Sequence, residues 1–155
     1  MKFSIPQKKA KFLSLGSNQG DRRENLVFAL DEINKVALIK RQSSLYETPA
    51  LLPEGAPTMW NVPFLNMVVE ISTDLSAEGF LKIIHAIEKK RDRVKDKKWA
   101  PRALDIDILL WDDVEIKSSQ LKIPHPEMNK RSFVLDPLKD LCPQFILAAR
   151  RLRTH

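Results

Sequence analysis

The sequence predicts a single α+β domain, and three observations support this fold class. The chain of 155 residues fits one domain and is long enough to bury a hydrophobic core. Its periodic segments follow the order strand, helix, strand, strand, helix, strand. Neither an internal repeat nor a long linker interrupts them. We therefore expect one domain over residues 1–155, with a core at about 11–143 and an unassigned tail at 148–155.

The first elements are indicated by short apolar runs and by turn residues. Residues 11–15 form an apolar strand candidate that ends in a Gly-Ser-Asn-Gln-Gly turn. Asp21 can cap the helix that follows, with Glu24 three residues later. The expected apolar face of this helix comprises Leu26, Ala29, Leu30 and Ile33. Residues 38–46 are predicted to form the second strand.

A long loop then separates two further strands and a second helix. Residues 48–63 hold four of the ten prolines, and a loop of this length inside a compact domain is usually functional. Strands are expected at 64–71 and 103–110. Between them, Ser76 caps a helix whose apolar side carries Phe80, Ile84 and Ile87.

The order of elements matches a ferredoxin-like antiparallel sheet, a βαββαβ core with both helices on one face and the other face free. The chain continues through a turn at Asp112 and Asp113 into residues 114–117, and ends in a short helical segment at about 131–141. An extra C-terminal hairpin and helix are therefore expected beyond the core.

Composition narrows the class of protein without naming a ligand. The formal charge of +6 favours an anionic partner, which could be nucleic acid, nucleotide or acidic lipid. The single cysteine, Cys142, excludes an intramolecular disulfide and favours a reducing compartment, so we expect a cytoplasmic protein. No apolar run approaches the roughly 18 residues of a membrane span.

Two carboxylates share one face of the strand predicted at 103–110. Alternation places Leu104, Ile106, Ile108 and Leu110 toward the core and turns Asp105 and Asp107 to the other face, about 7 Å apart at Cα. Such a pair suits Mg²⁺, which binds one or two protein carboxylates together with substrate phosphates. Alternatively, the two aspartates simply solvate an exposed sheet face.

A run of basic residues precedes this strand. Between residues 89 and 102 the chain carries eight cations: Lys89, Lys90, Arg91, Arg93, Lys95, Lys97, Lys98 and Arg102. At a helix end such a run can simply complement the helix dipole. Beside two carboxylates it predicts a polyphosphate site, because cations and metal ligands together can neutralise a triphosphate.

The strand predicted at 64–71 has polar residues on its outer face. Leu65, Met67, Val69 and Ile71 should face the core. The opposite face carries Phe64 and Asn66, an aromatic ring beside an amide, which suits a planar heterocycle. A cross-strand aromatic contact with a solvated amide explains the same pattern equally well.

A long motif links these features to a known family. The segment from Lys98 to Leu110, KWAPRALDIDILL, closely resembles the signature of the 6-hydroxymethyl-7,8-dihydropterin pyrophosphokinases of the folate pathway. Matching segments follow one another in the same order along the chain: LGSN at 15–18, SLYETP at 44–49, FLN at 64–66, and IPH at 123–125 with RSF at 131–133.

The resemblance implies a reaction and a set of site residues. The family transfers diphosphate from ATP, a co-substrate, to the hydroxymethyl group of the pterin and releases AMP. By similarity, Asp105 and Asp107 hold two Mg²⁺ ions, and Arg93 and Arg102 neutralise the transferring diphosphate. The implied pterin contacts are Thr48, Pro49, Leu51, Phe64, Asn66, Trp99 and Phe133. The implied ATP contacts are Glu88, Lys95, Lys98, Arg102, Ile108, Gln120, Lys122, His125 and Arg131.

A rival function remains open at this stage. An RRM-like nucleic-acid-binding module also combines a ferredoxin-like sheet with positive charge, although interleaved aromatic residues are missing from the central strands. On the main hypothesis we expect small-molecule substrates, with neither nucleic acid nor membrane as partner. The tail is a natural end, a cloning artefact or a junction to another folate-pathway domain.

Overall fold

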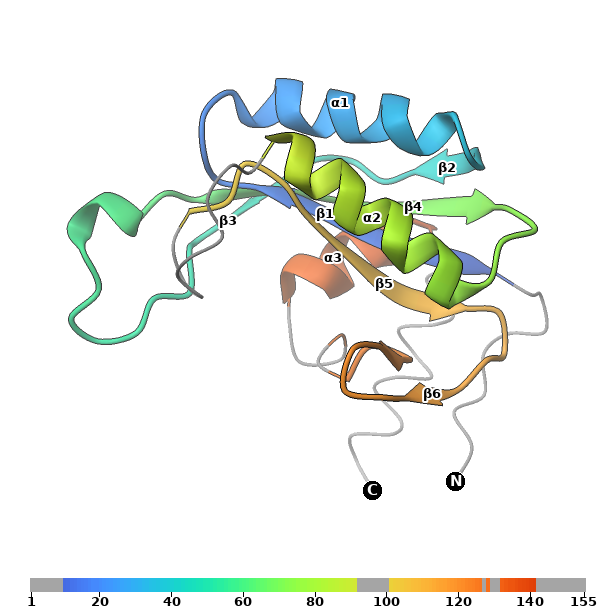
Figure 1. Cartoon of the computed structure of the whole chain (residues 1–155). Helices are drawn as coiled ribbons and strands as arrows, with labels where there is room; N and C mark the ends of the chain where they lie inside the picture. The colour runs from blue at the N-terminus through green and yellow to red at the C-terminus, as the bar shows by residue number, and fades with distance from the viewer. Residues whose placement is uncertain (1–9, 92–100, 127, 129–131, 142–155) are drawn as a thin grey trace.

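The computed structural model describes residues 10–91, 101–126, 128 and 132–141. One antiparallel sheet runs through the molecule in the order β2-β4-β1-β5, and β3 pairs with β4 beside β2. The central strands are β1 (Lys11–Ser17) and β4 (Phe64–Ser72), with β5 (Asp105–Trp111) at one edge. The helices α1 (Arg22–Asn34) and α2 (Ala77–Arg91) lie on one side of this sheet (Figure 1). The predicted ferredoxin-like core is confirmed.

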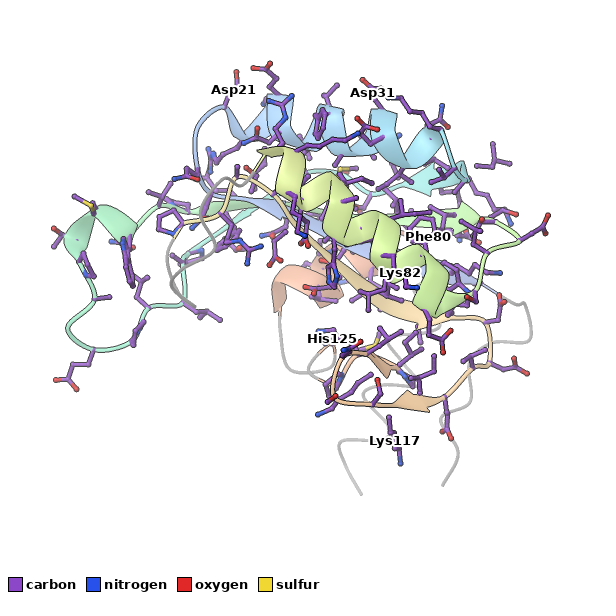
Figure 2. The ribbon with its side chains drawn as sticks, in the orientation of Figure 1. Asp21, Asp31, Phe80, Lys82, Lys117 and His125 are labelled. Carbon is purple, nitrogen blue, oxygen red and sulfur yellow. The ribbon has the colours of Figure 1, made fainter. Side chains whose placement is uncertain are left out.

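Both helix starts follow the predicted capping chemistry. The carboxylate of Asp21 accepts a hydrogen bond from the backbone N–H of Glu24 at 3.1 Å. The hydroxyl of Ser76 accepts one from the N–H of Gly79 at the same distance. The capped helices bury their apolar sides against the sheet, whereas Asp31 points away from it (Figure 2). The main core gathers Leu26, Ala29, Ile33, Phe80, Ile84 and Ile87 from the two helices.

The strand predicted at 38–46 is two strands. β2 (Leu38–Gln42) and β3 (Tyr46–Thr48) both pair with β4, and residues 43–45 separate them. At this break the side chain of Ser43 is buried, and its hydroxyl accepts a hydrogen bond from the backbone N–H of Val68 at 2.9 Å. The loop predicted at 48–63 contains one short 3₁₀ helix, η1 (Thr58–Trp60).

A β-bulge changes the predicted facing of Leu110. Leu13 pairs with Ile108 and Phe12 with Leu110, so Leu109 has no partner in β1. One extra residue reverses the alternation beyond it. Leu110 therefore lies with Leu109 on the far side of the sheet. Trp111 instead packs in the main core, where Leu110 was expected, and its ring centre lies 5.3 Å from that of Phe80. The prediction for Leu110 was wrong.

The far face of the sheet is also partly covered. The C-terminal helix α3 (Ser132–Leu141) packs there, on the side opposite α1 and α2 (Figure 1). A second core forms between α3 and the sheet from Phe12, Val68, Leu109, Leu110, Met128, Val134, Leu138 and Leu141. The expectation that the second face of the sheet is free is wrong where α3 packs. The sheet carries large apolar side chains there, which are buried only when another element packs against them.

Polar contacts fasten α3 to the strands beneath it. Asp140 accepts hydrogen bonds from the Tyr46 hydroxyl at 2.8 Å and from the N–H of Ser44 at 3.1 Å. These bonds lower the pKa of Asp140, the Tyr46 bond most, and raise the pKa of Tyr46. The folded state therefore favours the ionised form of Asp140. The contact stabilises the fold at pH values above the pKa of a free aspartate, and this stabilisation is lost as pH falls through the lowered pKa of Asp140.

The hairpin of β6 (Ile116–Lys117) and β7 (Lys122–Ile123) follows β5, as predicted for the extra hairpin. Asp112, with φ at 54°, makes the turn that leads into it. Its carboxylate pairs with Lys11 at 2.8 Å. Within the described residues, no helix combines the length and apolar composition needed to cross a membrane.

The second core predicts a measurable contribution from α3. Leu138 is fully buried there, so Leu138→Ala should lower the free energy of unfolding by about 2–5 kcal/mol, through lost burial and the cavity left behind. Leu75→Ala, the same change at a residue 40% exposed, should cost less than about 0.5 kcal/mol. Urea titration measures both, and equal losses would contradict a packed α3.

Candidate active site

The site begins with a row of paired residues across the sheet. Gly16 of β1 pairs with Asn66 of β4 on one side and with Asp105 of β5 on the other. Directly paired residues of an antiparallel sheet turn to the same face. The amide predicted to recognise a heterocycle and the first carboxylate of the predicted metal pair are therefore two strands apart on one face.

The glycine in this row leaves space for the amide. A Cβ at Gly16 would lie 2.8 Å from Oδ1 of Asn66 and 3.4 Å from the Phe64 ring, too close for an unchanged Asn66. Asn66 is 97% buried, and its Nδ2 donates to the hydroxyl of Thr48 at 2.6 Å. Phe64 pairs with Thr48 in the register of β3 and β4. Three of the predicted pterin contacts thus lie together.

Other predicted pterin contacts lie farther along the chain. Pro49 and Leu51 follow β3 in the loop, where both are exposed, Leu51 to 57%. Trp99 lies outside the described residues. Phe133 belongs to α3, and its side chain is likewise outside the described part of the structure.

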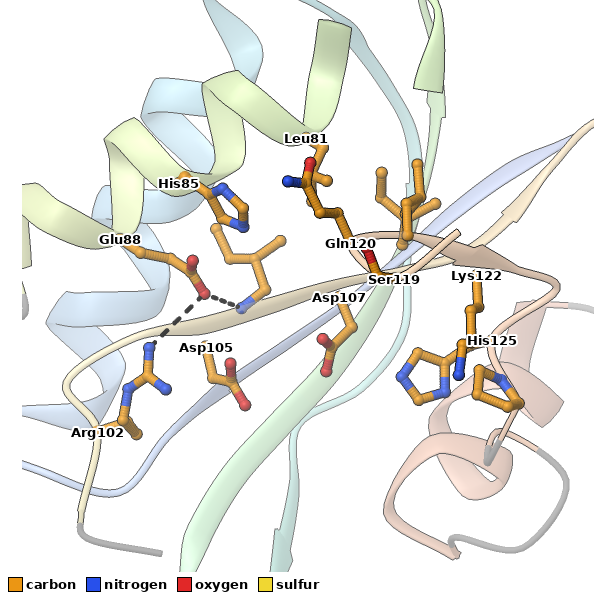
Figure 3. Close-up of a pocket in the computed structure, with 14 residues that line it drawn as sticks. Leu81, His85, Glu88, Arg102, Asp105, Asp107, Ser119, Gln120, Lys122 and His125 are labelled. Atoms are coloured by element: carbon orange, nitrogen blue, oxygen red, sulfur yellow. Dashed lines mark hydrogen bonds and ion pairs between the residues drawn. The ribbon is translucent and has the colours of Figure 1, made fainter. Parts of the chain in front are cut away.

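The carboxylate pair lies at the open edge of the sheet. Asp105 and Asp107 point to the same side of β5, on either side of Ile106 (Figure 3). Both are half-buried and line a cavity of about 460 Å³. In the part of the chain that the structure describes, no three His, Cys, Asp or Glu side chains gather into a metal-binding group. Asp105 and Asp107 are thus two described carboxylates that could hold a hard cation, which prefers oxygen ligands.

The cavity brings together residues from three parts of the chain. One wall is α2, the floor is β5, and the other wall is the hairpin with the segment after it (Figure 3). The backbone N–H of His125 donates to the carbonyl of Leu109 at 3.0 Å, which fastens this segment to β5. Of the predicted ATP contacts, the cavity lining includes Glu88, Arg102, Ile108, Gln120, Lys122 and His125.

The remaining predicted phosphate contacts, Arg93, Lys95, Lys98 and Arg131, lie outside the described residues. Two members of the basic run contact residues of α1 instead of the cavity. Lys90 pairs with Glu32 of α1 at 3.1 Å, and the Arg91 guanidinium stacks 4.1 Å from the centre of the Phe28 ring. Lys90, followed by Lys35, lowers the pKa of Glu32. These two cations join α2 to α1, so the run does not converge as a whole on the carboxylates.

Asn18 is a site residue that sequence reasoning missed: it was predicted as part of a turn and of the family-matching LGSN segment, with no site role. It is 98% buried and exchanges two hydrogen bonds with the backbone of Arg102: its N–H donates to the Arg102 carbonyl at 2.9 Å, and its Oδ1 accepts the Arg102 N–H at 2.7 Å. Its Nδ2 donates to the carbonyl of Val62 at 3.1 Å. One side chain therefore joins the ends of two loops.

Arg22 holds the 48–63 loop at its base. Its guanidinium pairs with Glu47 at 2.9 Å and donates to the carbonyl of Pro63 at the same distance. His85 of α2 and Ser119 of the hairpin line the cavity as well. The sequence carried no signal for His85 and Ser119, since only the fold brings them to the cavity that the two aspartates line.

Comparison with known proteins finds a family profile and several relatives that resemble this chain. The profile of the 7,8-dihydro-6-hydroxymethylpterin-pyrophosphokinase (HPPK) family matches residues 12–143. The 2-amino-4-hydroxy-6-hydroxymethyldihydropteridine pyrophosphokinase of Bacillus subtilis is 38% identical over 135 residues, covering 86% of this chain and 78% of the relative. Its counterpart from Aquifex aeolicus is also 38% identical, covering 87% and 81%.

Other relatives are longer. The folate synthesis bifunctional protein of Chlamydia muridarum is 40% identical over 134 residues, which are 84% of this chain and 30% of that protein. The chain thus spans about a third of the length of such relatives. Among solved structures, wild-type HPPK-DHPS of Plasmodium falciparum with SDX-DHP has the same fold, with a TM-score of 0.65 at 17% identity, covering 94% of this chain and 44% of that one.

The contacts of Asn18 predict a stability cost for its removal. Asn18→Ala leaves the Arg102 N–H and the Val62 carbonyl without their partner, and should lower the free energy of unfolding by about 1–3 kcal/mol. The exposed Asn34 provides the matched control, with a change below about 0.5 kcal/mol for Asn34→Ala. Denaturant unfolding compares the two, and equal effects would disprove the role of Asn18.

Proposed function

The chain belongs to the 7,8-dihydro-6-hydroxymethylpterin-pyrophosphokinase family, and we propose that it transfers the β,γ-diphosphate of ATP to the hydroxymethyl oxygen of 6-hydroxymethyl-7,8-dihydropterin in folate biosynthesis. One observation carries the proposal: Asn66, Gly16 and Asp105 form one row. A heterocycle bound at Asn66 would have its substituent close to the carboxylate pair, where a nucleotide in the neighbouring cavity would present its phosphates.

The pterin site is built around Asn66. A pterin offers hydrogen-bond donors and acceptors along a flat ring, and an amide can satisfy one of each. Thr48 orients this amide, and Phe64 adds apolar surface beside it. We assign Pro49, Leu51, Trp99 and Phe133 to the remaining pterin contacts by family similarity.

The cavity beside β5 takes the nucleotide. Arg102 lies near the start of β5, and Lys122 and His125 are on the hairpin side. Ile108 and Gln120 supply apolar and amide surface for the nucleoside. By family similarity, the cations Arg93, Lys95, Lys98 and Arg131 complete the phosphate contacts. Positive groups on both sides of the triphosphate favour its binding and the negative charge that builds on the leaving AMP.

Asp105 and Asp107 fit a Mg²⁺ site. Two adjacent carboxylates on one strand face, with room for other ligands, match an ion that keeps substrate phosphates and water in its coordination shell. We propose two such ions, which when bound polarise the phosphate oxygens and neutralise their charge. Asp105 and Asp107 would hold these ions beside the cavity that they line.

The reaction needs alignment rather than a covalent intermediate. The hydroxymethyl oxygen forms a bond to the β-phosphorus, the bond from that phosphorus to the α,β-bridging oxygen breaks, and AMP leaves with the electron pair. The hydroxyl proton passes to water. The sheet supplies a rigid surface that keeps the two substrates in line, and Arg102 stabilises the diphosphate as it moves.

Nothing in the comparisons favours the RRM-like alternative. An RNA chain on this face would meet two carboxylates at Asp105 and Asp107, which repel phosphates in the absence of metal. The alternative predicts RNA binding without ATP turnover, so a single assay distinguishes the two functions.

We further propose that residues 11–143 act as one domain in the cytoplasm, consistent with the single cysteine of the sequence. The bifunctional relatives support a fusion to a second folate-pathway domain in the native chain. The tail at 148–155 stays unassigned.

The carboxylate pair gives the sharpest test. With Mg²⁺, ATP and the hydroxymethylpterin, the wild-type protein should release AMP only when the pterin is present. Asp107→Ala should retain less than a hundredth of this activity, a barrier increase above about 2.7 kcal/mol, because it removes one of the two carboxylates that would hold the Mg²⁺ ions. The exposed Asp113 is the matched control, and Asp113→Ala should stay within twofold of wild type.

Two results would contradict the proposal. Release of AMP that does not depend on the pterin would show a different acceptor. Activity of Asp107→Ala close to that of wild type would remove the metal assignment.

A further inference from the structure

Glu88 is a buried carboxylate on α2 that faces the edge strand β5. Its side chain is 6% exposed. Oε2 accepts a hydrogen bond from the backbone N–H of Ile106 at 3.0 Å, and the same oxygen lies 4.0 Å from Nη2 of Arg102 (Figure 3). A buried charge needs such partners, because water no longer solvates it.

The first contact binds β5 at Ile106, between the two aspartates. Ile106 stands between Asp105 and Asp107, so its N–H belongs to the backbone that carries both carboxylates. β5 pairs with β1 along one edge, and Glu88 provides an acceptor along the other. The carboxylate thus fixes the strand from the helix side.

The second contact completes the support of Arg102. The backbone of Arg102 is fixed by its two hydrogen bonds to Asn18. Its guanidinium, 27% exposed, lies beside Glu88 and lines the cavity. Main chain and side chain therefore have different neighbours: Asn18 bonds the backbone of Arg102, and Glu88 lies beside its guanidinium.

A direct contact of Glu88 with the nucleotide is unfavourable. A carboxylate repels a triphosphate, and an oxygen that already accepts the Ile106 N–H and faces a guanidinium gains little from a nucleotide hydroxyl. Fixed beside Arg102, the same charge is useful, because it keeps a long flexible side chain in one rotamer before ATP arrives.

We propose that Glu88 is a positioning residue, which holds the Arg102 guanidinium for the phosphates of ATP without touching the nucleotide. This role rests on the proposed function, since it needs a phosphate ligand for Arg102. It replaces the expectation that Glu88 is itself an ATP contact.

A double-mutant cycle tests the proposal. Glu88→Gln keeps the shape and the acceptor for the Ile106 N–H but removes the charge beside Arg102. The dissociation constant of a Mg²⁺-bound, non-hydrolysable ATP analogue is measured by calorimetry for wild type, Glu88→Gln, Arg102→Ala and the double variant. We expect Glu88→Gln to weaken binding about tenfold in the wild-type background and less than twofold in the Arg102→Ala background.

The control is a carboxylate that pairs with cations away from the cavity. Glu32→Gln removes the partner of Lys90 and Lys35 and should leave analogue binding within twofold of wild type. Amide exchange by NMR checks the fold independently. The Ile106 N–H should exchange slowly in wild type, and its protection should stay within threefold in Glu88→Gln because the acceptor remains.

Three outcomes overturn the role. Losses that multiply in the double variant would mean that Glu88 contacts the nucleotide or acts apart from Arg102. Binding by Glu88→Gln equal to that of wild type would remove any function of the charge. Fast exchange of the Ile106 N–H in wild type would contradict the geometry. If instead wild-type protein releases no pterin-dependent AMP, the proposed function fails first, and this role with it.

Discussion

The pairing of β1 with β4 on one side and β5 on the other is the constraint on which the site depends. This register fixes Asn66, Gly16 and Asp105 in one row on one face of the sheet. A slip of one residue along either strand would turn the amide or the carboxylate toward the helices. Gly16 is part of the same constraint, because a side chain there would displace Asn66. The alternation of polar and apolar residues excludes such a slip, because it would turn the main-core residues of that strand away from the helices.

The face of the sheet that carries the site is covered by α3 at one end of β5 and bears the two aspartates at the other. The bulge at Leu109 brings Leu109 and Leu110 together on the far side, where α3 covers them. Before the bulge the strand alternates regularly and turns its two aspartates to one side. Asn18 and Arg22 then hold the loops that border this open end, from the turn and helix that directly follow β1. β1 thus aligns the row of site residues, and the residues that directly follow it bind the loops around the site.

Much of this arrangement could be predicted from local patterns. Period-two alternation identified β4 and β5, and the caps at Asp21 and Ser76 located both helices. The carboxylate pair followed from the same alternation. The prediction was wrong where tertiary packing outweighed the pattern: the bulge reversed Leu110, Ser43 broke one strand into two, and α3 covered a face expected to be free. Asn18 carried no local signal, because its function comes from contacts with residues 44 and 84 positions away.

The central claim is that the two substrates meet on one row of the sheet. The most direct measurement is a crystal structure with a non-hydrolysable ATP analogue, the hydroxymethylpterin and Mn²⁺ in place of Mg²⁺, since manganese gives an anomalous signal. The account predicts anomalous peaks at the carboxylates of Asp105 and Asp107, with the pterin against Asn66 and its hydroxymethyl group directed toward the metal. Manganese bound away from this pair, or a pterin on another surface, would contradict it.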